Sequence, residues 1–222
     1  NSLAKGVSGI RPEIVEMLLC MVNHGIAPVV PRIGSLGASG DLAPLSHMSL
    51  ALLGEGECMM RTDSGWVRTS SVEALSSAGL APVVLLAKEG LSLINGTSQM
   101  CAYLVITLLN MERLVMCADA SAACSIEAIK GSHDPFDSRI HQNRPQRGQS
   151  ISAARIFEFV NDSDINESHS NCDRVQDAYC FRCAPQVHGP VIDLITETRR
   201  MLEIEINSAT DNPLVFVDND SV

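Results

Sequence analysis

Aromatic residues are scarce in this sequence: one tryptophan, two tyrosines and five phenylalanines make up 4% of its 222 residues. Positive charge is scarce too, because 16 lysines and arginines stand against 26 aspartates and glutamates, giving a formal net charge of −10. Nucleic-acid binding needs a basic surface, and single strands also stack on aromatic rings. We therefore expect no nucleic-acid partner, and an anionic membrane surface would repel the chain.

Long uncharged apolar runs are lacking as well. The most apolar stretch, "MCAYLVITLLNMERLVMCA", is interrupted by Asn110, Glu112 and Arg113, whereas a membrane span needs about 20 apolar residues. The sequence therefore predicts no membrane segment. It shows no signal peptide and starts at Asn1 instead of methionine, so we expect an internal fragment of a cytoplasmic protein.

A disulfide framework is not indicated, although there are eight cysteines. Several of them, such as Cys20, Cys101 and Cys117, lie in apolar stretches, where a free cysteine behaves as a small hydrophobic residue. Without a secretory signal, reduced thiols are expected.

Hydrophobic residues make up 45% of the chain and follow helical spacing, while sustained alternation typical of strands is lacking. The pattern predicts a mainly α protein with long bundle helices. No clear internal boundary is visible, so residues 1–222 are expected to form one incomplete segment. The expected helices are Pro12–Gly25, Asp41–Gly54, Ser71–Gly79, a long one after Thr97, Asp119–Lys130, and one from about Arg174 to Asn207 that is kinked or interrupted at Pro185 and Pro190. A polar loop is expected over residues 131–149.

Three glycines stand at three-residue spacing in "GSLGASGDLAPLSH", which runs from Gly34 to His47. A phosphate-binding loop is one interpretation, but the spacing is Gly-x-x-Gly-x-x-Gly and no Gly-Lys-Ser/Thr follows. A tight turn before a helix is the second, with glycines at positive φ and Ser39 or Asp41 as the helix cap.

A third interpretation of the same loop is chemical. In Ala38-Ser39-Gly40, the Gly40 nitrogen can attack the Ala38 carbonyl carbon in a tight turn, and loss of water closes a five-membered ring. Loss of a second water from Ser39 leaves an exocyclic methylene, and the product is the electrophile methylidene-imidazolone. A helix starting near Asp41 would stabilise negative charge on the ring oxygen, and we expect the Asp41 side chain to be turned into a cap.

Five stretches of the chain occur in an order found in one enzyme family: "GSLGASGDLAPLSHMSLALLGEGE", "AKEGLSLINGTS", "PFDSRIHQNRPQRGQ", "SHSNCDRVQDAYCFRCAPQVHG" and "NSATDNPLVF". Together they resemble the histidine branch of the aromatic amino acid lyase family over nearly the whole chain. The resemblance implies a largely helical homotetramer with active sites assembled from more than one subunit. It also implies that Ala38, Ser39 and Gly40 form the methylidene-imidazolone group, without an external cofactor.

The resemblance extends to substrate-binding residues. Asn95 of "INGT" matches the asparagine that contacts the substrate beside the ring, although an ordinary helix cap before Thr97 is an alternative. Asn212 of "TDNP", with the proline after it, matches a motif near the site and is expected to be supporting structure.

A second group of matched residues lies in "VQDAYCFR". Gln176, Tyr179 and Arg182 stand at i, i+3 and i+6, which would spread them over one helix face. The resemblance implies that the glutamine and the tyrosine, a catalytic residue, lie near the electrophile. It implies that the arginine pairs with the substrate carboxylate, which its planar fork suits. A solvated polar stripe is the alternative.

A zinc-binding helical module is a candidate from another class of function. His169, Cys172, Cys180 and Cys183 read His-x2-Cys-x7-Cys-x2-Cys, a pattern that could bind zinc. The last two cysteines fall inside the expected helix and the loop between the pairs is short, so we expect no metal.

The activity implied by the resemblance is the conversion of L-histidine to trans-urocanate and ammonia. Ser98 departs from this pattern, because histidine enzymes usually have glutamine after Asn-Gly-Thr. "NGTS" is closer to the tyrosine lyases and aminomutases, so a tyrosine or phenylalanine ammonia-lyase or an aminomutase is the alternative. The resemblance places the base and the imidazole-contacting residues outside these 222 residues.

Overall fold

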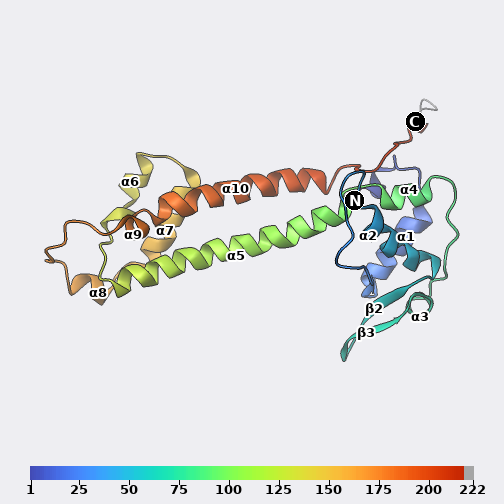
Figure 1. Cartoon of the computed structure of the whole chain (residues 1–222), viewed down its shortest axis with the longest axis horizontal. Coiled ribbons are helices and arrows are strands. Elements are labelled where there is room, and N and C mark those ends of the chain that lie inside the picture. Colours follow the sequence, from blue (N-terminus) through green and yellow to red (C-terminus); the bar gives the residue numbers. More distant parts are fainter. Residues whose placement is uncertain (218–222) are drawn as a thin grey trace. The chain divides into compact units, whose positions relative to one another are not determined.

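A computed structural model describes residues 1–217, which fall into two compact units. The first unit comprises residues 1–104 and 202–217, and the second comprises residues 105–201. The first unit contains η1 (Leu3–Lys5), α1 (Pro12–Asn23), β1 (Ile26–Pro28), α2 (Leu42–Leu50), η2 (Ala51–Leu53), β2 (Glu57–Thr62), β3 (Gly65–Ser70), α3 (Ser71–Ser77), α4 (Glu89–Ile94) and the start of α5 (Ser98–Ala128) (Figure 1). The expected α class is confirmed.

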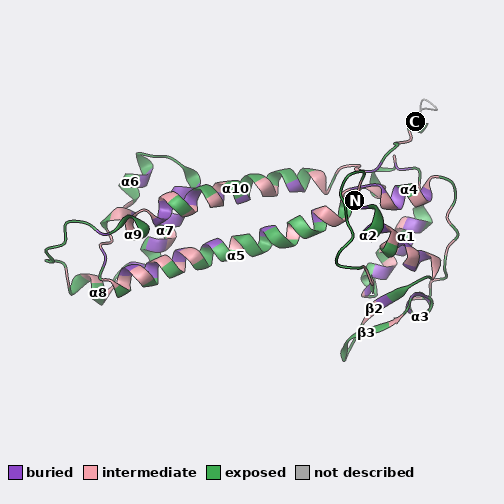
Figure 2. Ribbon diagram, viewed as in Figure 1, coloured by how far each residue is buried: buried purple, intermediate pink, exposed green. Residues whose placement is uncertain are grey.

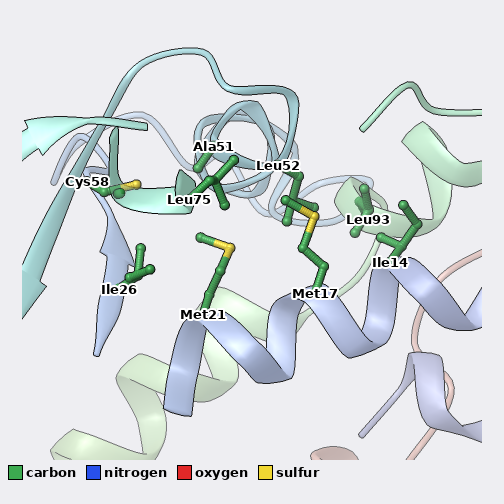
Figure 3. Close-up of a cluster of buried hydrophobic side chains, with 10 residues drawn as sticks. Ile14, Met17, Met21, Ile26, Ala51, Leu52, Cys58, Leu75 and Leu93 are labelled. Atoms are coloured by element: carbon green, nitrogen blue, oxygen red, sulfur yellow. The ribbon is translucent and has the colours of Figure 1, made fainter. Parts of the chain in front are cut away.

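The core of the first unit is built on α1. Pro12 stands at the first position of this helix, where its missing N–H costs nothing. Ile14, Met17 and Met21 follow at three- and four-residue spacing and are all buried. Figure 3 shows these side chains directed toward a cluster that includes Leu52 and Leu75. Burying each such side chain contributes roughly 1.5–3 kcal/mol, so this cluster holds α1 against η2 and α3.

A small antiparallel sheet, of order β1-β2-β3, was not expected from the sequence. Glu57 pairs with Ser70 and Thr62 pairs with Gly65, so β2 and β3 form a hairpin closed by two residues. Most side chains of this hairpin are exposed. Because neither face is fully buried, the strands lack the alternation by which sequence patterns reveal a strand.

Helix α5 is a single helix of 31 residues, so the expected new helix at Asp119 is wrong. Asp119 is fully buried in mid-helix, where its carboxylate accepts hydrogen bonds from Ser152 Oγ at 2.5 Å and His188 Nδ1 at 2.8 Å. An aspartate suggests a helix start only when its side chain is free to cap. Here the carboxylate is held by two other helices.

Several apolar residues of α5 are exposed, among them Ile106, Leu114 and Met116. In Figure 2 much of the α5 ribbon is green or pink, which marks exposed and intermediate residues. An 18-residue window in the helical stretch Glu89–Ala128 has a mean hydropathy of 1.5. By length and composition alone this stretch could span a membrane, contrary to the expectation that no stretch could. Core helices of soluble proteins meet the same criterion.

The second unit packs α5 against shorter helices and α10. Its remaining elements are η3 (Asp134–Phe136), α6 (Ser138–Gln142), α7 (Arg147–Val160), α8 (Asp164–Glu167), α9 (Tyr179–Arg182) and α10 (Ala184–Glu205). Residues 131–149, expected to be a loop, therefore contain two short helical elements and the start of α7. The core of the unit comprises Ala123, Ile126, Phe136, Ile156, Val160 and Ala184, with Phe181 packed against it.

The expected continuous helix from Arg174 is also wrong, because residues 174–178 are irregular and α9 has only four residues. Pro185 stands at the second position of α10, whereas Pro190 lies inside this helix, which continues to Glu205, so the interruption considered at Pro190 is absent. Gln176 therefore precedes α9 and does not share a helix face with Tyr179 and Arg182. Ala178 is extended, with φ −63° and ψ 150°, which sets the start of α9.

Candidate active site

The loop before α2 has the backbone that its glycines permit. Gly34, Gly37 and Gly40 have φ values of 141°, 66° and 112°, a region that side chains rarely enter. Ala38 and Ser39 are exposed on this loop, and α2 begins at Leu42. The chain therefore presents Ala-Ser-Gly in a tight turn immediately before a helix N-terminus.

Gly40 lies against the backbone of the segment that links α4 to α5. A Cβ added at Gly40 would lie 2.8 Å from Gly96 N and 3.0 Å from the Asn95 carbonyl carbon. The Asp41 N–H donates to the Gly96 carbonyl oxygen at 2.8 Å. Only glycine fits at position 40, for steric reasons as well as for its φ.

Asn95 connects the loop to a third segment of the first unit. Its Nδ2 donates to the carbonyl oxygen of Asn212 at 3.0 Å and to Asn212 Oδ1 at 2.9 Å. The amide orientation is thereby fixed, because both acceptors must face the NH₂ group. Asn95 Oδ1 then faces Ser39, whose Oγ donates to it at 3.4 Å. Asn212, expected only as supporting structure, thus contacts Asn95 directly.

Asp41 does not cap its own helix, contrary to expectation. Its Oδ2 accepts the N–H of Met100 at 2.8 Å, and Met100 is the third residue of α5. Its Oδ1 accepts from Ser35 Oγ at 3.1 Å. The buried Asp41 carboxylate therefore satisfies a free N–H at the start of α5 and ties both ends of the glycine loop to that helix.

An ion pair between the buried Glu89 carboxylate and the partly exposed Arg11 holds the start of α4, the helix whose C-cap is Asn95. The Glu89 carboxylate, 2% exposed, accepts from Arg11 Nε at 2.7 Å and from Leu86 N at 2.6 Å. The Arg11 guanidinium is the main reason that the pKa of Glu89 falls from 4.5 to about 2. This charge-assisted contact fixes α4 and, through it, the position of Asn95.

The remaining predicted site residues belong to the second unit. Tyr179 is 72% exposed, and the Arg182 guanidinium carbon lies 4.1 Å from the centre of its ring. Arg182 Nε donates to the carbonyl oxygen of Asp177 at 3.0 Å. Gln176 is exposed and lines a polar pocket of about 290 Å³ together with His169 and Arg174.

The structure thus brings together two groups of predicted residues. Ser39, Gly40 and Asn95 meet in the first unit, with Ala38 on the same loop, and Tyr179 meets Arg182 in the second unit. Sequence reasoning missed Asp177, whose buried carboxylate accepts from Ser132 N and Arg174 Nη1 and whose backbone carbonyl oxygen accepts from Arg182 Nε. Its place inside "VQDAYCFR" was a signal.

The alternative zinc site finds no support in the geometry. Within residues 1–217, no three His, Cys, Asp or Glu side chains gather in a group that could hold a metal ion. Cys172 and Cys180 of the proposed pattern are both exposed.

Comparison with known proteins adds to this geometry. The family model described as aromatic amino acid lyase matches residues 1–222. The chain belongs to the aromatic amino acid lyase family. The resemblance expected from the sequence is confirmed.

Named relatives in this family include histidine enzymes. Histidine ammonia-lyase of Stigmatella aurantiaca is 50% identical over 222 residues, which are all of this chain and 43% of that protein. The crystal structure of histidine ammonia-lyase from Trypanosoma cruzi superposes with a TM-score of 0.81 and 38% identity, covering 97% of this chain and 39% of that one. The chain thus spans less than half the length of the relatives that it matches.

A mutase also lies among the solved members of the family. Tyrosine aminomutase from Streptomyces globisporus superposes with a TM-score of 0.82 and 37% identity, covering 97% of this chain and 43% of that one. The fold of residues 1–217 is therefore common to lyases and mutases of the family.

Proposed function

We propose that this chain is part of an ammonia-lyase that converts L-histidine to trans-urocanate and ammonia. The observation that carries the substrate assignment is 50% identity over all 222 residues to a relative named histidine ammonia-lyase. The Ser39–Asn95 contact supports the same chemistry, because it places the hydroxyl that must be lost beside a fixed amide.

A methylidene-imidazolone made from Ala38, Ser39 and Gly40 fits the loop. Ring closure needs the Gly40 nitrogen to approach the Ala38 carbonyl carbon, and the φ of 112° at Gly40 belongs to a turn that only glycine adopts readily. A Cβ at this position would collide with Gly96, so the backbone is already closely packed there. The group would supply an electrophile that turns the substrate amine into a better leaving group.

The side chains of the chain itself bind and orient the substrate in this proposal. Arg182 pairs with the substrate carboxylate through its guanidinium, and Gln176 contributes a neutral hydrogen-bonding group nearby. The phenol O–H of Tyr179 can donate a proton to the amine as it leaves. Asn95 contacts the substrate through the amide that Asn212 orients.

We further propose that the intact protein is a cytoplasmic homotetramer whose active sites combine residues of several subunits. Exposed apolar side chains on α5 support this assembly, since water-exposed apolar surface favours association. The exposed large apolar residues of α5 are Tyr103, Leu104, Ile106, Leu109, Met111, Leu114 and Met116. In such an assembly, the Ala38–Gly40 loop of one subunit and the Gln176, Tyr179 and Arg182 side chains of another subunit would form one active site.

An action on tyrosine or phenylalanine, as lyase or aminomutase, is the second candidate. Ser98 favours it, because histidine enzymes usually carry glutamine at this position. Ser98 is exposed at the first position of α5, three residues after Asn95. The residue at this position can therefore differ between enzymes that act on different substrates without disturbing the packing of α5.

The test of the proposed function is an assay of the intact protein with L-histidine, L-tyrosine and L-phenylalanine in parallel. Ultraviolet absorbance reports urocanate, coumarate or cinnamate, and chromatography of the amino acids reports any β-isomer. We expect urocanate from histidine at a rate at least tenfold above the other two. Preferential loss of tyrosine or phenylalanine, or the appearance of a β-amino acid, would favour the second candidate.

A further inference from the structure

Asp177 contacts both Arg182, the residue proposed to bind the substrate carboxylate, and Ser132, which lies just beyond the C-terminal end of α5. It directly follows Gln176, yet its side chain is only 5% exposed, whereas Gln176 is exposed. A buried carboxylate needs several partners to offset its lost hydration. The partners of Asp177 show which segments it joins.

Both carboxylate oxygens of Asp177 accept hydrogen bonds from other parts of the second unit. Oδ2 accepts the backbone N–H of Ser132 at 2.7 Å, just beyond the end of α5. Oδ1 accepts from Arg174 Nη1 at 3.0 Å, and the same nitrogen donates to the Ile129 carbonyl oxygen at 3.2 Å. The irregular segment 174–178 is therefore fastened to residues 129–132 at two points.

The backbone carbonyl group of Asp177 forms a hydrogen bond with Arg182. Its carbonyl oxygen accepts from Arg182 Nε at 3.0 Å, while the Tyr179 ring lies 4.1 Å from the guanidinium carbon. Nε is therefore occupied and one face of the guanidinium is covered. Within the described residues 1–217, the terminal nitrogens Nη1 and Nη2 of Arg182 make no hydrogen bond. This end of the guanidinium presents two parallel N–H groups, which suit a carboxylate.

We propose that Asp177 is a positioning residue for substrate binding: it fixes Arg182 so that the substrate carboxylate binds end-on, through Nη1 and Nη2. The inference rests on the proposed function, since it requires an amino acid substrate. An arginine side chain has many rotamers, and ordering it only on binding weakens affinity. Asp177 orders it beforehand. The resulting interaction is the same in the ground state and the transition state, so its loss raises KM and leaves kcat nearly unchanged.

The variant that tests this role is Asp177→Asn in the intact protein. Asparagine has the same shape but has one acceptor oxygen fewer and no charge for Arg174. Asp173→Asn is the matched control, because Asp173 is exposed and lies four residues before Asp177, immediately before the irregular segment 174–178. We expect KM for the amino acid substrate to rise about tenfold in Asp177→Asn, which corresponds to about 1.4 kcal/mol, with kcat within about twofold. The control should match the wild type.

A pair of ligands separates positioning from general structural damage. Binding of L-histidine and of histamine, which lacks the carboxylate, is measured by calorimetry on each variant. The proposal predicts that Asp177→Asn weakens histidine about tenfold and leaves histamine unchanged. Equal weakening of both ligands, or a fall in kcat with unchanged KM, would overturn it.

Two further outcomes are also decisive. If Asp177→Asn does not fold, Arg174→Gln is tested instead, because it removes one partner of Asp177 at a half-exposed position. This variant must weaken histidine binding, by less than Asp177→Asn would, and leave histamine binding unchanged. Any other result would show that the proposal is wrong. If the wild type binds no amino acid in this assay, both the proposed function and this inference fail. If it binds and processes tyrosine instead, the same test is run with tyrosine and tyramine, so that only the substrate assignment fails.

Discussion

The Asp41 carboxylate accepts the N–H of Met100 at 2.8 Å, so the residue that follows Ala-Ser-Gly caps the start of α5 and not its own helix α2. Because the Asp41 N–H also donates to Gly96, the glycine loop is attached on both sides of the α4–α5 connection. The geometry of the loop therefore depends on residues about sixty positions further along the chain.

Replacing Asp41 by alanine should loosen this attachment. The Met100 N–H would lose its partner in a partly buried position, and we expect a loss of about 1–2 kcal/mol in the free energy of unfolding. Chemical denaturation measures the loss. Asp63→Ala in the exposed hairpin turn is the control and should change stability by less than about 0.5 kcal/mol. Equal effects of the two changes would show that Asp41 does not anchor the loop.

Gly40→Ala should be more damaging than a glycine-to-alanine change at the same backbone angle elsewhere. Gly65 provides the comparison, because its φ of 114° matches the 112° of Gly40 but nothing lies within 4 Å of an added Cβ. Both variants carry the strain of a positive φ, and only Gly40→Ala adds a contact of 2.8 Å to Gly96 N. We expect an additional loss of about 1–3 kcal/mol for Gly40→Ala in denaturation experiments. Similar losses would mean that the loop can move away from Gly96 without cost.

Arg182→Lys should weaken substrate binding in the intact enzyme by roughly 1.5–3 kcal/mol, because lysine keeps the charge but loses the two-pronged geometry. Steady-state kinetics would show this mainly as a higher KM. Arg200→Lys is the control, since Arg200 pairs with Glu197 on the exposed side of α10. A similar loss for an inhibitor without a carboxylate would instead indicate a structural role for Arg182.

The Glu89–Arg11 pair should make stability depend on acid pH. The pKa of Glu89 is lowered to about 2 in the folded chain, from 4.5. Its stabilising contribution is therefore present above about pH 4.5 and is lost as the pH falls toward 2, by roughly 3 kcal/mol. Glu89→Gln should lack this part of the pH dependence in denaturation curves, whereas Glu16→Gln, at an exposed position of α1, should retain it. Curves of the same shape for wild type and Glu89→Gln would contradict this assignment.

The local structures predicted correctly around the candidate site are those encoded by short motifs. The glycine loop before α2 and the place of Asn95 before α5 both follow from short motifs with glycine and cap residues. The contact between Asn95 and Asn212 joins residues 117 positions apart. No pattern within either motif contains that pairing, so Asn212 was assigned only a supporting role.

The errors have a common physical cause, which is tertiary contact overriding local pattern. Gln176 fits a helical spacing with Tyr179, but the buried Asp177 carboxylate binds Ser132 and keeps residues 174–178 out of a helix. Asp119 resembles a helix start, but its partners on α7 and α10 hold it inside α5. Helix propensity is weaker than such buried polar networks.

The central claim is that Ala38, Ser39 and Gly40 form an electrophile, and the mass of the intact active protein tests it most directly. Ring closure and dehydration of Ser39 each remove one water, so the wild-type chain should weigh about 36 Da less than its sequence. Ser39→Ala keeps a small residue in the turn but has no hydroxyl to lose. It should fold, lack the dehydrated group and lose activity by orders of magnitude. A fully active wild-type sample with the plain sequence mass would contradict the account.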